Sequence, residues 1–333
     1  MLARAVARLP PSASQRLAGD FCPIFMLHRV SAGAAEHGQS AAHIESCLRL
    51  VRRYGFTPIS LQALAEAWLR DTALPPKPVV FTIDDGFADH AEIAGDIFAR
   101  YDTPLTCFVI TGFLDGELWP WDDQIAWALR VATPGSFGLT LPDGVPWEVC
   151  LSSDSVDREI RYLREALKRL AQDGLYEWLP SFYRTLAVEV PAAPPPEYRP
   201  MTWPQARAFV CQGHTIAPHT HTHRILSCLP DDDARREIDT SISRVRAELG
   251  ETPRVFAYPT GRDSDFGFRE QQLLRDAGLV CAVSTAPRTA TPAENAFAMP
   301  RFSLPESEAD FLQYLSFVEL AKERFRGARR PTR

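Results

Sequence analysis

The sequence lacks the features that mark secreted and membrane-spanning proteins. Its seven cysteines are odd in number, form no Cys-x-x-Cys pair and lie in several cases within apolar runs. This usage is typical of buried thiols in a reducing compartment and excludes a disulfide framework. No window approaches the roughly 18 apolar residues of a membrane span. Arg4, Arg8 and Pro10-Pro11 interrupt the start of the chain, which therefore has no signal-peptide pattern, and we expect a cytoplasmic location.

An excess of positive charge is also lacking. The 333 residues include 36 Lys or Arg and 42 Asp or Glu, for a formal net charge of −6, so nucleic acid is not expected as a partner. The end of the chain is the exception, with basic side chains at Lys322, Arg324, Arg326, Arg329, Arg330 and Arg333. We interpret this tail either as a solvated end or as a weak peripheral contact with anionic lipid at the inner membrane face. Residues 1–9 allow a short amphipathic helix lying on a membrane as an alternative.

What the sequence does contain is an alternation of short apolar runs and helical patterns. Strands are predicted over residues 22–27, 79–83, 105–110, 214–217, 254–258, 279–283 and 296–299. Helices are predicted over residues 41–54, 61–70, 88–101, 203–211, 238–249 and 271–277. Ser60 is a helix-capping residue, and Thr202 with Gln205 has the form of a capping box. Alternating strands and helices indicate a parallel α/β sheet, and strands this short and apolar on both faces favour a closed barrel.

A different pattern runs from about residue 113 to residue 199. It is rich in tryptophan, and Val156 to Leu170 carry apolar residues at helical spacing. The proline-rich stretch 191–200 cannot be helical and is predicted to be a linker. We interpret 113–199 as a helical insertion within a main domain of residues 20–310. Residues 1–19 would form an N-terminal extension, and 311–333 a C-terminal helix with the basic tail.

Two polar clusters follow predicted strands. Asp84 and Asp85 come at the end of an apolar strand, and His219, His221 and His223 follow another. The carboxyl ends of parallel barrel strands converge on one face, where active sites are built. Neighbouring side chains of a strand point to opposite sides, so one carboxylate can bind a metal while the other faces the reacting water. For the aspartates alone, a capping turn before a helix is the alternative.

The histidine spacing makes a metal site the stronger interpretation. His219 and His223 are four residues apart, so they can converge on one ion if the chain turns helically. Imidazole and carboxylate suit zinc first, with Co²⁺, Ni²⁺ and Fe²⁺ as alternatives. Two histidines and one carboxylate leave positions open for water and substrate, as in catalytic sites. His221 either faces solvent or supports the site from behind.

The order of motifs resembles one family. Thr82-Ile83-Asp84-Asp85-Gly86, the histidines 219–223, Phe256-Ala-Tyr-Pro-Thr-Gly261 and Met26-Leu-His28-Arg-Val30 are similar to motifs of the polysaccharide deacetylases. These form carbohydrate esterase family four, with the NodB homology domain, and the third and fourth segments resemble its exopolysaccharide deacetylase branch. The resemblance covers roughly residues 20–305, interrupted by the insertion. Each motif alone is weak, and their combination is specific.

The resemblance implies a distorted or incomplete (β/α) barrel that removes an N-acetyl group from an amino sugar. It implies Asp84 as the general base. It implies a divalent metal ion held by Asp85, His219 and His223. It also implies a backbone N–H in the third motif that stabilises the oxyanion and binds substrate, within Tyr258, Thr260 and Gly261.

The chain departs from the family pattern at two places. Family members commonly carry a late histidine as general acid, but no histidine follows His223. His28 and His221 are the candidates, with His28 ahead because it ends the first predicted strand. The arginine that holds the base in the third motif is Ala257 here, and Arg301 would replace it, with a surface ion pair as the alternative.

A group of aromatic and acidic residues begins the insertion: Trp119, Trp121, Asp122 and Asp123. Trp121 and Asp122 would bind a sugar by stacking and by hydrogen bonds to its hydroxyls; the alternative is a hydrophobic plug. Two further functions stay open. One is deacetylation or deformylation of a lipid-linked sugar at the inner membrane face. The other is a non-catalytic carbohydrate-binding relative, against which the intact Asp84 argues.

Overall fold

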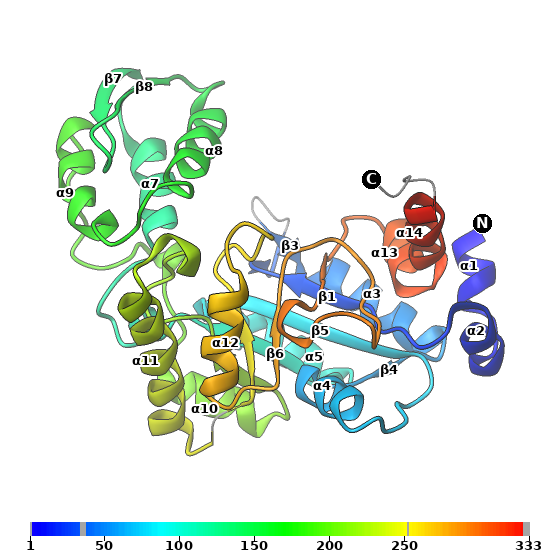
Figure 1. Cartoon of the computed structure of the whole chain (residues 1–333). Helices are drawn as coiled ribbons and strands as arrows, with labels where there is room; N and C mark the ends of the chain where they lie inside the picture. Colours follow the sequence, from blue (N-terminus) through cyan, green and yellow to red (C-terminus); the bar gives the residue numbers. More distant parts are fainter. Residues whose placement is uncertain (1, 34–37, 252, 329–333) are drawn as a thin grey trace.

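A parallel sheet of six strands forms the centre of the structure (Figure 1). The computed structural model describes residues 2–33, 38–251 and 253–328. In sheet order, the strands are β12 (Phe302–Ser303), β1 (Ile24–Leu27), β5 (Pro78–Asp85), β6 (Leu105–Val109) and β9 (Thr215–Pro218), and β4 (Thr57–Pro58) pairs with the start of β5. All these pairs are parallel, so the carboxyl ends of the strands lie at one edge.

Helices flank this sheet, and two of them begin at the caps expected from the sequence. The flanking helices are α3 (Ala41–Arg53), α4 (Leu61–Leu69), α5 (Asp96–Arg100), α6 (Thr111–Leu114), α10 (Trp203–Cys211), α11 (Asp231–Leu249) and α12 (Phe268–Asp276). Ser60 accepts a hydrogen bond from the N–H of Ala63, and Thr202 forms the expected capping box with Gln205. The capping predictions are therefore confirmed.

The sheet does not continue into a closed barrel. The next strands, β10 (Val255–Ala257) and β11 (Cys281–Val283), form a parallel pair of their own, and Val283 makes a parallel bridge to Met299. Within the described residues no strand pairing joins β9 to β10, although the two strands lie close together. The parallel α/β fold is confirmed, and this gap is consistent with an incomplete barrel.

Three secondary-structure predictions are corrected. Residues 296–299 form the 3₁₀ turn η4 (Ala296–Ala298), because the Asn295 side chain accepts the N–H of Phe297 and starts a turn; the strand follows at β12. The helix expected over 88–101 is divided into the π-helix η1 (His90–Gly95) and α5. The linker 191–200 contains one 3₁₀ turn, η2 (Pro196–Tyr198). Further short elements are β2 (Val30–Ser31), β3 (Gln39–Ser40) and η3 (Leu226–Cys228).

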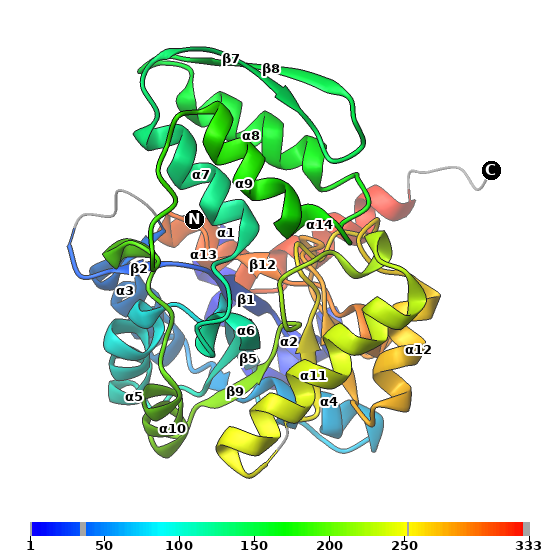
Figure 2. The same ribbon diagram turned by 90° about the vertical axis from the view of Figure 1, so that its left-hand side faces the viewer.

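The insertion forms a lobe above the rest of the chain (Figure 2). It contains α7 (Trp121–Val131), α8 (Val156–Leu167), α9 (Leu175–Thr185) and the antiparallel hairpin of β7 (Gly135–Thr140) and β8 (Pro146–Leu151). The expected helices of the insertion are therefore present, and the hairpin is an addition that was not predicted. The hairpin turns at Pro142-Asp-Gly144, where Asp143 accepts the N–H of Val145 and Gly144 has a φ of 83°. Its helices and hairpin enclose an apolar core distinct from that of the barrel.

Both ends of the described chain lie at the far end of the sheet from the insertion (Figure 1). Helices α1 (Leu2–Ala7) and α2 (Pro11–Ala18) lie beside α13 (Glu308–Leu315) and α14 (Val318–Ala328). The expected basic tail lies in α14 up to Ala328, and residues 329–333 are outside the described residues. No helix in the described part of the chain is long and apolar enough to cross a membrane.

The cysteines are all free. Cys22, Cys47, Cys107 and Cys281 are buried, as expected for thiols in apolar runs, whereas Cys150 and Cys211 are exposed. The expectation of buried thiols therefore holds for the barrel strands and helix α3 but not for every cysteine.

Candidate active site

The two polar clusters meet at the carboxyl ends of β5 and β9. Asp84 and Asp85 are the last residues of β5, and the histidines follow β9 directly. Asp85 and Gly86 have φ angles of 89° and 83°, which turn the chain sharply away from the strand. A Cβ on Gly86 would lie 2.9 Å from Leu114 Cδ1, so glycine is required both for backbone conformation and for space.

Asp85, His219 and His223 form one cluster of metal-ligating atoms. Asp85 Oδ1 lies 3.5 Å from Nε2 of His219 and 3.5 Å from Nε2 of His223. The three donor atoms all lie within 4.8 Å of one another. Both histidines are buried and Asp85 is partly buried. Segments far apart in the sequence are thus brought together as the sequence analysis expected.

This donor set fits a divalent ion. His219 Nδ1 lies 2.7 Å from the carbonyl oxygen of Ala257 and donates to it, which leaves the Nε2 lone pair directed at Asp85. Burial opposes ionisation of Asp85, but in the absence of a metal ion a protonated His219 that donates to Asp85 and the charge of a protonated His223 outweigh it and hold the pKa of Asp85 well below its usual range. An ionised carboxylate and two imidazole nitrogens are suitable ligands for first-row divalent metals, and three protein ligands leave coordination positions open.

Asp84 directly precedes the ligand candidate Asp85 in β5 and is held by Arg301. Arg301 Nη1 and Nη2 donate to the two oxygens of Asp84, each at 2.8 Å. Nη1 also donates to Thr82 Oγ1 at 3.0 Å, and Nε donates to the carbonyl of Ser284 at 2.9 Å. Burial alone would raise the pKa of Asp84, but the charge and hydrogen bonds of Arg301 lower it. Arg301 is 0% exposed, so the alternative of a surface ion pair is wrong.

The two proton-donor candidates have different surroundings. His28 follows β1, is exposed, and lies close enough to Asp84 and Asp85 to lower the pKa of both. Its backbone oxygen accepts a 2.6 Å hydrogen bond from the buried His90. His221 instead pairs with Thr111 Oγ1 at 2.9 Å and with Glu117 at 3.2 Å. Within the described residues, the His28 side chain thus has no hydrogen-bond partner, whereas that of His221 has two contacts.

Three residues expected to bind substrate have buried side chains with other roles. Trp121 is 1% exposed and donates to the carbonyl of His223 at 3.2 Å, so it has no open face for a sugar ring. Asp122 is buried and pairs with Arg164 and His223. Tyr258 is 1% exposed and stacks on the Phe266 ring, with its hydroxyl donating to the carbonyl of Phe297. The sugar contacts expected of the Trp121 and Asp122 side chains are wrong because both are packed inside the protein, whereas the expectation for the segment of Tyr258 concerns its backbone.

Thr260 and Gly261 form a tight turn after β10. Their φ angles are 57° and 62°. The N–H of Gly261 donates to Pro259 at 2.6 Å, and the N–H of Tyr258 donates to Val283 at 3.5 Å. The hydroxyl of Thr260 donates to Asp265. The backbone N–H of Thr260 has no acceptor within the described residues, so it is the amide of this segment left to bind an oxyanion.

The acidic pair at the start of α7, Asp122 and Asp123, has surroundings that the sequence did not predict. Asp123 is partly buried; burial, and then the negative charge of Asp122, raise its pKa to about 8. His90 was not singled out at all. The Asp122-Asp123 pair is visible in the sequence, but its direction towards the histidine loop depends on packing between distant segments.

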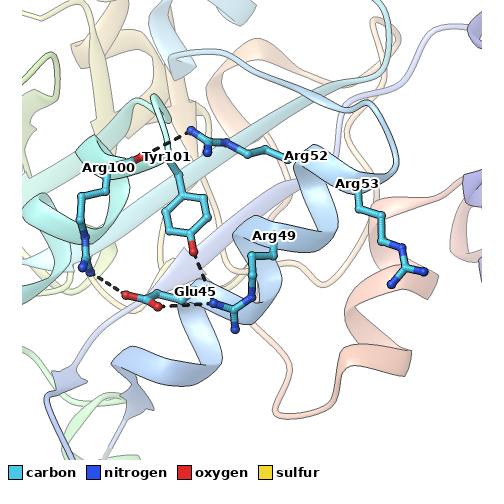
Figure 3. A pocket seen from close by; sticks show the side chains of 6 residues that line it. All are labelled: Glu45, Arg49, Arg52, Arg53, Arg100 and Tyr101. Carbon is cyan, nitrogen blue, oxygen red and sulfur yellow. Dashed lines mark hydrogen bonds and ion pairs between the residues drawn. The ribbon is translucent and has the colours of Figure 1, made fainter.

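A separate hollow lies away from this site, at the ends of α3 and α5 (Figure 3). It has a volume of about 700 Å³ and is lined by Glu45, Arg49, Arg52, Arg53, Arg100 and Tyr101. Arg49 and Arg100 pair with Glu45, and Arg52 donates to the carbonyl of Arg100. Basic residues are favourable at helix C-termini, which explains this cluster without a ligand.

The site thus combines three side chains that could hold a metal ion with an adjacent buried carboxylate paired to an arginine. The polysaccharide deacetylase family matches residues 71–281. The chain belongs to this family, and the resemblance seen in the motifs is confirmed.

Solved structures show the same fold. The Streptococcus pyogenes deacetylase PplD, in complex with acetate, has a TM-score of 0.59 and 18% identity, covering 89% of this chain and 99% of that one. IcaB from Ammonifex degensii has a TM-score of 0.59 and 16% identity, covering 89% and 97%. The BpsB deacetylase domain from Bordetella bronchiseptica has a TM-score of 0.53 and 19% identity, covering 85% and 95%. A search of curated proteins gives no match.

Proposed function

We propose that this protein is a metal-dependent carbohydrate N-deacetylase that removes an acetyl group from an amino sugar in a polysaccharide or glycan precursor. The observation that carries the proposal is the convergence of Asp85, His219 and His223, with the Asp84–Arg301 pair adjacent in the same strand end. Family membership and the exopolysaccharide deacetylases among the similar structures support the substrate class.

The residues divide the reaction between them. A divalent ion held by Asp85, His219 and His223 would lower the pKa of water to about 7 and polarise the acetyl carbonyl. Asp84 accepts the proton of the attacking water, because Arg301 keeps it ionised at neutral pH. Each carboxylate oxygen has two acceptor sites, so an oxygen bonded to Arg301 still has one free for the proton. Arg301 thus acts as a positioning residue for the base.

An oxyanion donor and two candidate proton donors complete the proposed reaction. The N–H of Thr260 donates to the oxygen that becomes negatively charged when water attacks the acetyl carbon. His28 then gives a proton to the leaving amine, and Asp123 is a second donor because its raised pKa keeps it protonated at neutral pH. The exposed position of His28 allows a sugar amine to approach it from solvent.

The experiment measures acetate released from chitooligosaccharides and other N-acetylated glycans by Zn²⁺-loaded protein. We expect Asp84→Asn to keep its metal and to lose about 10²- to 10⁴-fold in turnover, the usual contribution of a positioned base. His28→Ala and Asp123→Asn are assayed in parallel, and the larger loss of kcat identifies the donor. Wild-type turnover in Asp84→Asn would overturn the assignment of the base.

We infer a cytoplasmic protein acting on an N-acetylated carbohydrate, with a lipid-linked sugar at the inner membrane face as the alternative substrate. In α14, Lys322 and Arg326 pair with Glu319 while Arg324 donates to Ala18, so a lipid contact would rest mainly on the basic residues 329–333. Co-sedimentation with anionic vesicles, with and without residues 322–333, tests this; equal sedimentation would reject the contact.

A further inference from the structure

We propose that the insertion is a working part of the metal centre, because the carboxylate of Asp122 holds His223 in the orientation needed for ligation. The inference rests on the proposed role of His223 as a metal ligand. It assigns to α7 a positioning residue in place of the sugar-binding role expected from the sequence.

The His223 ring lies between two carboxylates. Its Nε2 is 3.5 Å from Asp85, and its Nδ1 is 3.4 Å from Asp122 Oδ1. Both Nδ1 of His223 and Oδ1 of Asp122 are buried and have no other hydrogen-bond partner within the described residues. A small shift of the ring therefore satisfies both orphaned atoms with one hydrogen bond, from Nδ1–H to the carboxylate.

The position of Asp122 is itself fixed by the insertion. Arg164 of α8 pairs with its second oxygen, Oδ2. The adjacent Trp121 donates from Nε1 to the backbone carbonyl of His223 at 3.2 Å. Side chain and main chain of one histidine are thus held by two successive residues of α7.

The insertion also holds the residues on both sides of His223. The hydroxyl of Tyr176 donates to the carbonyl of Thr222 at 2.7 Å, and Gln172 accepts the N–H of Ile225 at 2.7 Å. His223 and Thr220 have φ angles of 59° and 64°, an uncommon conformation for these residues that persists only when surrounding contacts enforce it. The insertion supplies part of these contacts, and Glu237 of α11 accepts the N–H groups of His221 and Thr222, so the loop depends on the lobe as well as on α11.

A carboxylate behind a ligating histidine has a known physical effect. Accepting Nδ1–H fixes the tautomer, so the lone pair lies on Nε2, and it strengthens the nitrogen as a ligand. Loss of such a partner typically weakens metal affinity about 10- to 100-fold. The competing explanation is that Asp122 only pairs with Arg164 to pack α7 against α8, which predicts lower stability and unchanged metal affinity.

The test compares two carboxylates that each pair with a histidine of the same loop. Asp122→Ala removes the partner of His223, and Glu117→Ala removes the partner of His221, which lies outside the ligand cluster. Zn²⁺ affinity is measured by competition with a chromophoric chelator, without substrate, and thermal unfolding of metal-free protein is recorded alongside. We expect Asp122→Ala to weaken affinity about 10- to 100-fold and Glu117→Ala to leave it within about 2-fold of wild type.

Wild-type affinity in folded Asp122→Ala would overturn the inference, whatever its unfolding temperature. A wild-type protein that binds no Zn²⁺ would instead refute the proposed metal centre. If Asp122→Ala does not fold, ¹⁵N-edited spectra of Zn²⁺-loaded wild-type protein decide the question, with His223→Gln used for assignment. A protonated Nδ1 and a ligated Nε2 support the inference, and the reverse tautomer refutes it.

Discussion

The barrel and the insertion hold two histidines of one loop by different means. His219 is fixed by a backbone carbonyl of the barrel, that of Ala257 in β10. His223 is fixed by a side-chain carboxylate of the insertion, that of Asp122. A backbone acceptor is set by strand packing and is kept under any side-chain substitution, whereas a carboxylate can be removed by a single change. One ligand position is therefore determined by the packing of the main fold, whereas the other depends on an added lobe.

The largest expected effect on metal binding comes from removing the histidine ligands themselves. His219→Ala and His223→Ala each take away one of three metal-binding atoms, so we expect both proteins to lose the ion. Elemental analysis after gel filtration measures the metal content. Retention of a full equivalent of metal by either variant would contradict the ligand set, whichever region holds the histidine.

The second prediction concerns a substitution in the barrel that leaves the insertion unchanged. Arg301→Leu leaves Asp84 as a buried charge without a partner, and we expect a loss of about 3–5 kcal/mol in the free energy of unfolding. Denaturant unfolding at neutral pH measures this loss.

The same variant predicts a shift in pH dependence. In the wild-type protein the pKa of Asp84 is lowered, so its contribution to stability is complete above its unfolded value of about 3.9 and is lost as pH falls through the folded value. Without Arg301, burial raises the pKa of Asp84. The acid limb of kcat/KM should therefore move to higher pH, and an unchanged limb would show that Asp84 is not the titrating base.

The smallest expected effect on Zn²⁺ affinity comes from two matched cavities, one in the insertion and one in the barrel. Leu163 in α8 and Leu312 in α13 are both fully buried, the first in the core of the insertion and the second in the core of the barrel. Each change to alanine should cost about 2–5 kcal/mol of stability. Only Leu163→Ala should also weaken Zn²⁺ binding, by a few-fold, because it loosens the lobe that holds His223. Equal Zn²⁺ affinities in the two variants would show that the lobe is not coupled to the site.

The sequence predicted the site where local chemistry determines it. The end of β5, the histidine loop and the caps at Ser60 and Thr202 follow from apolar runs and short motifs, and the structure has them as expected. Arg301 could be predicted as the residue that holds the base because the third motif does not contain the arginine that usually does so. Its reach to Asp84 depends on β12 lying beside β1, which no local pattern specifies.

The errors share a physical cause. Trp121 and Asp122 have side chains that suit sugar binding, but burial decides their roles, and burial results from packing between distant segments. The β7–β8 hairpin was not predicted, although Pro142-Asp-Gly144 is a strong turn signal. The reason is that the strongest periodicity of this stretch is the helical one of α8.

The interrupted pairing between β9 and β10 divides the backbone into two hydrogen-bonded units. Amide exchange in proteins proceeds through such cooperative units, each opening with its own free energy. The amides of β1, β5, β6 and β9 should exchange slowly as one group, and those of β10 and β11 earlier as another. The turn at Thr260, which we propose to bind the oxyanion, belongs to the second unit, so earlier exchange there would show that this side of the site can open while the carboxylates of β5 stay in place.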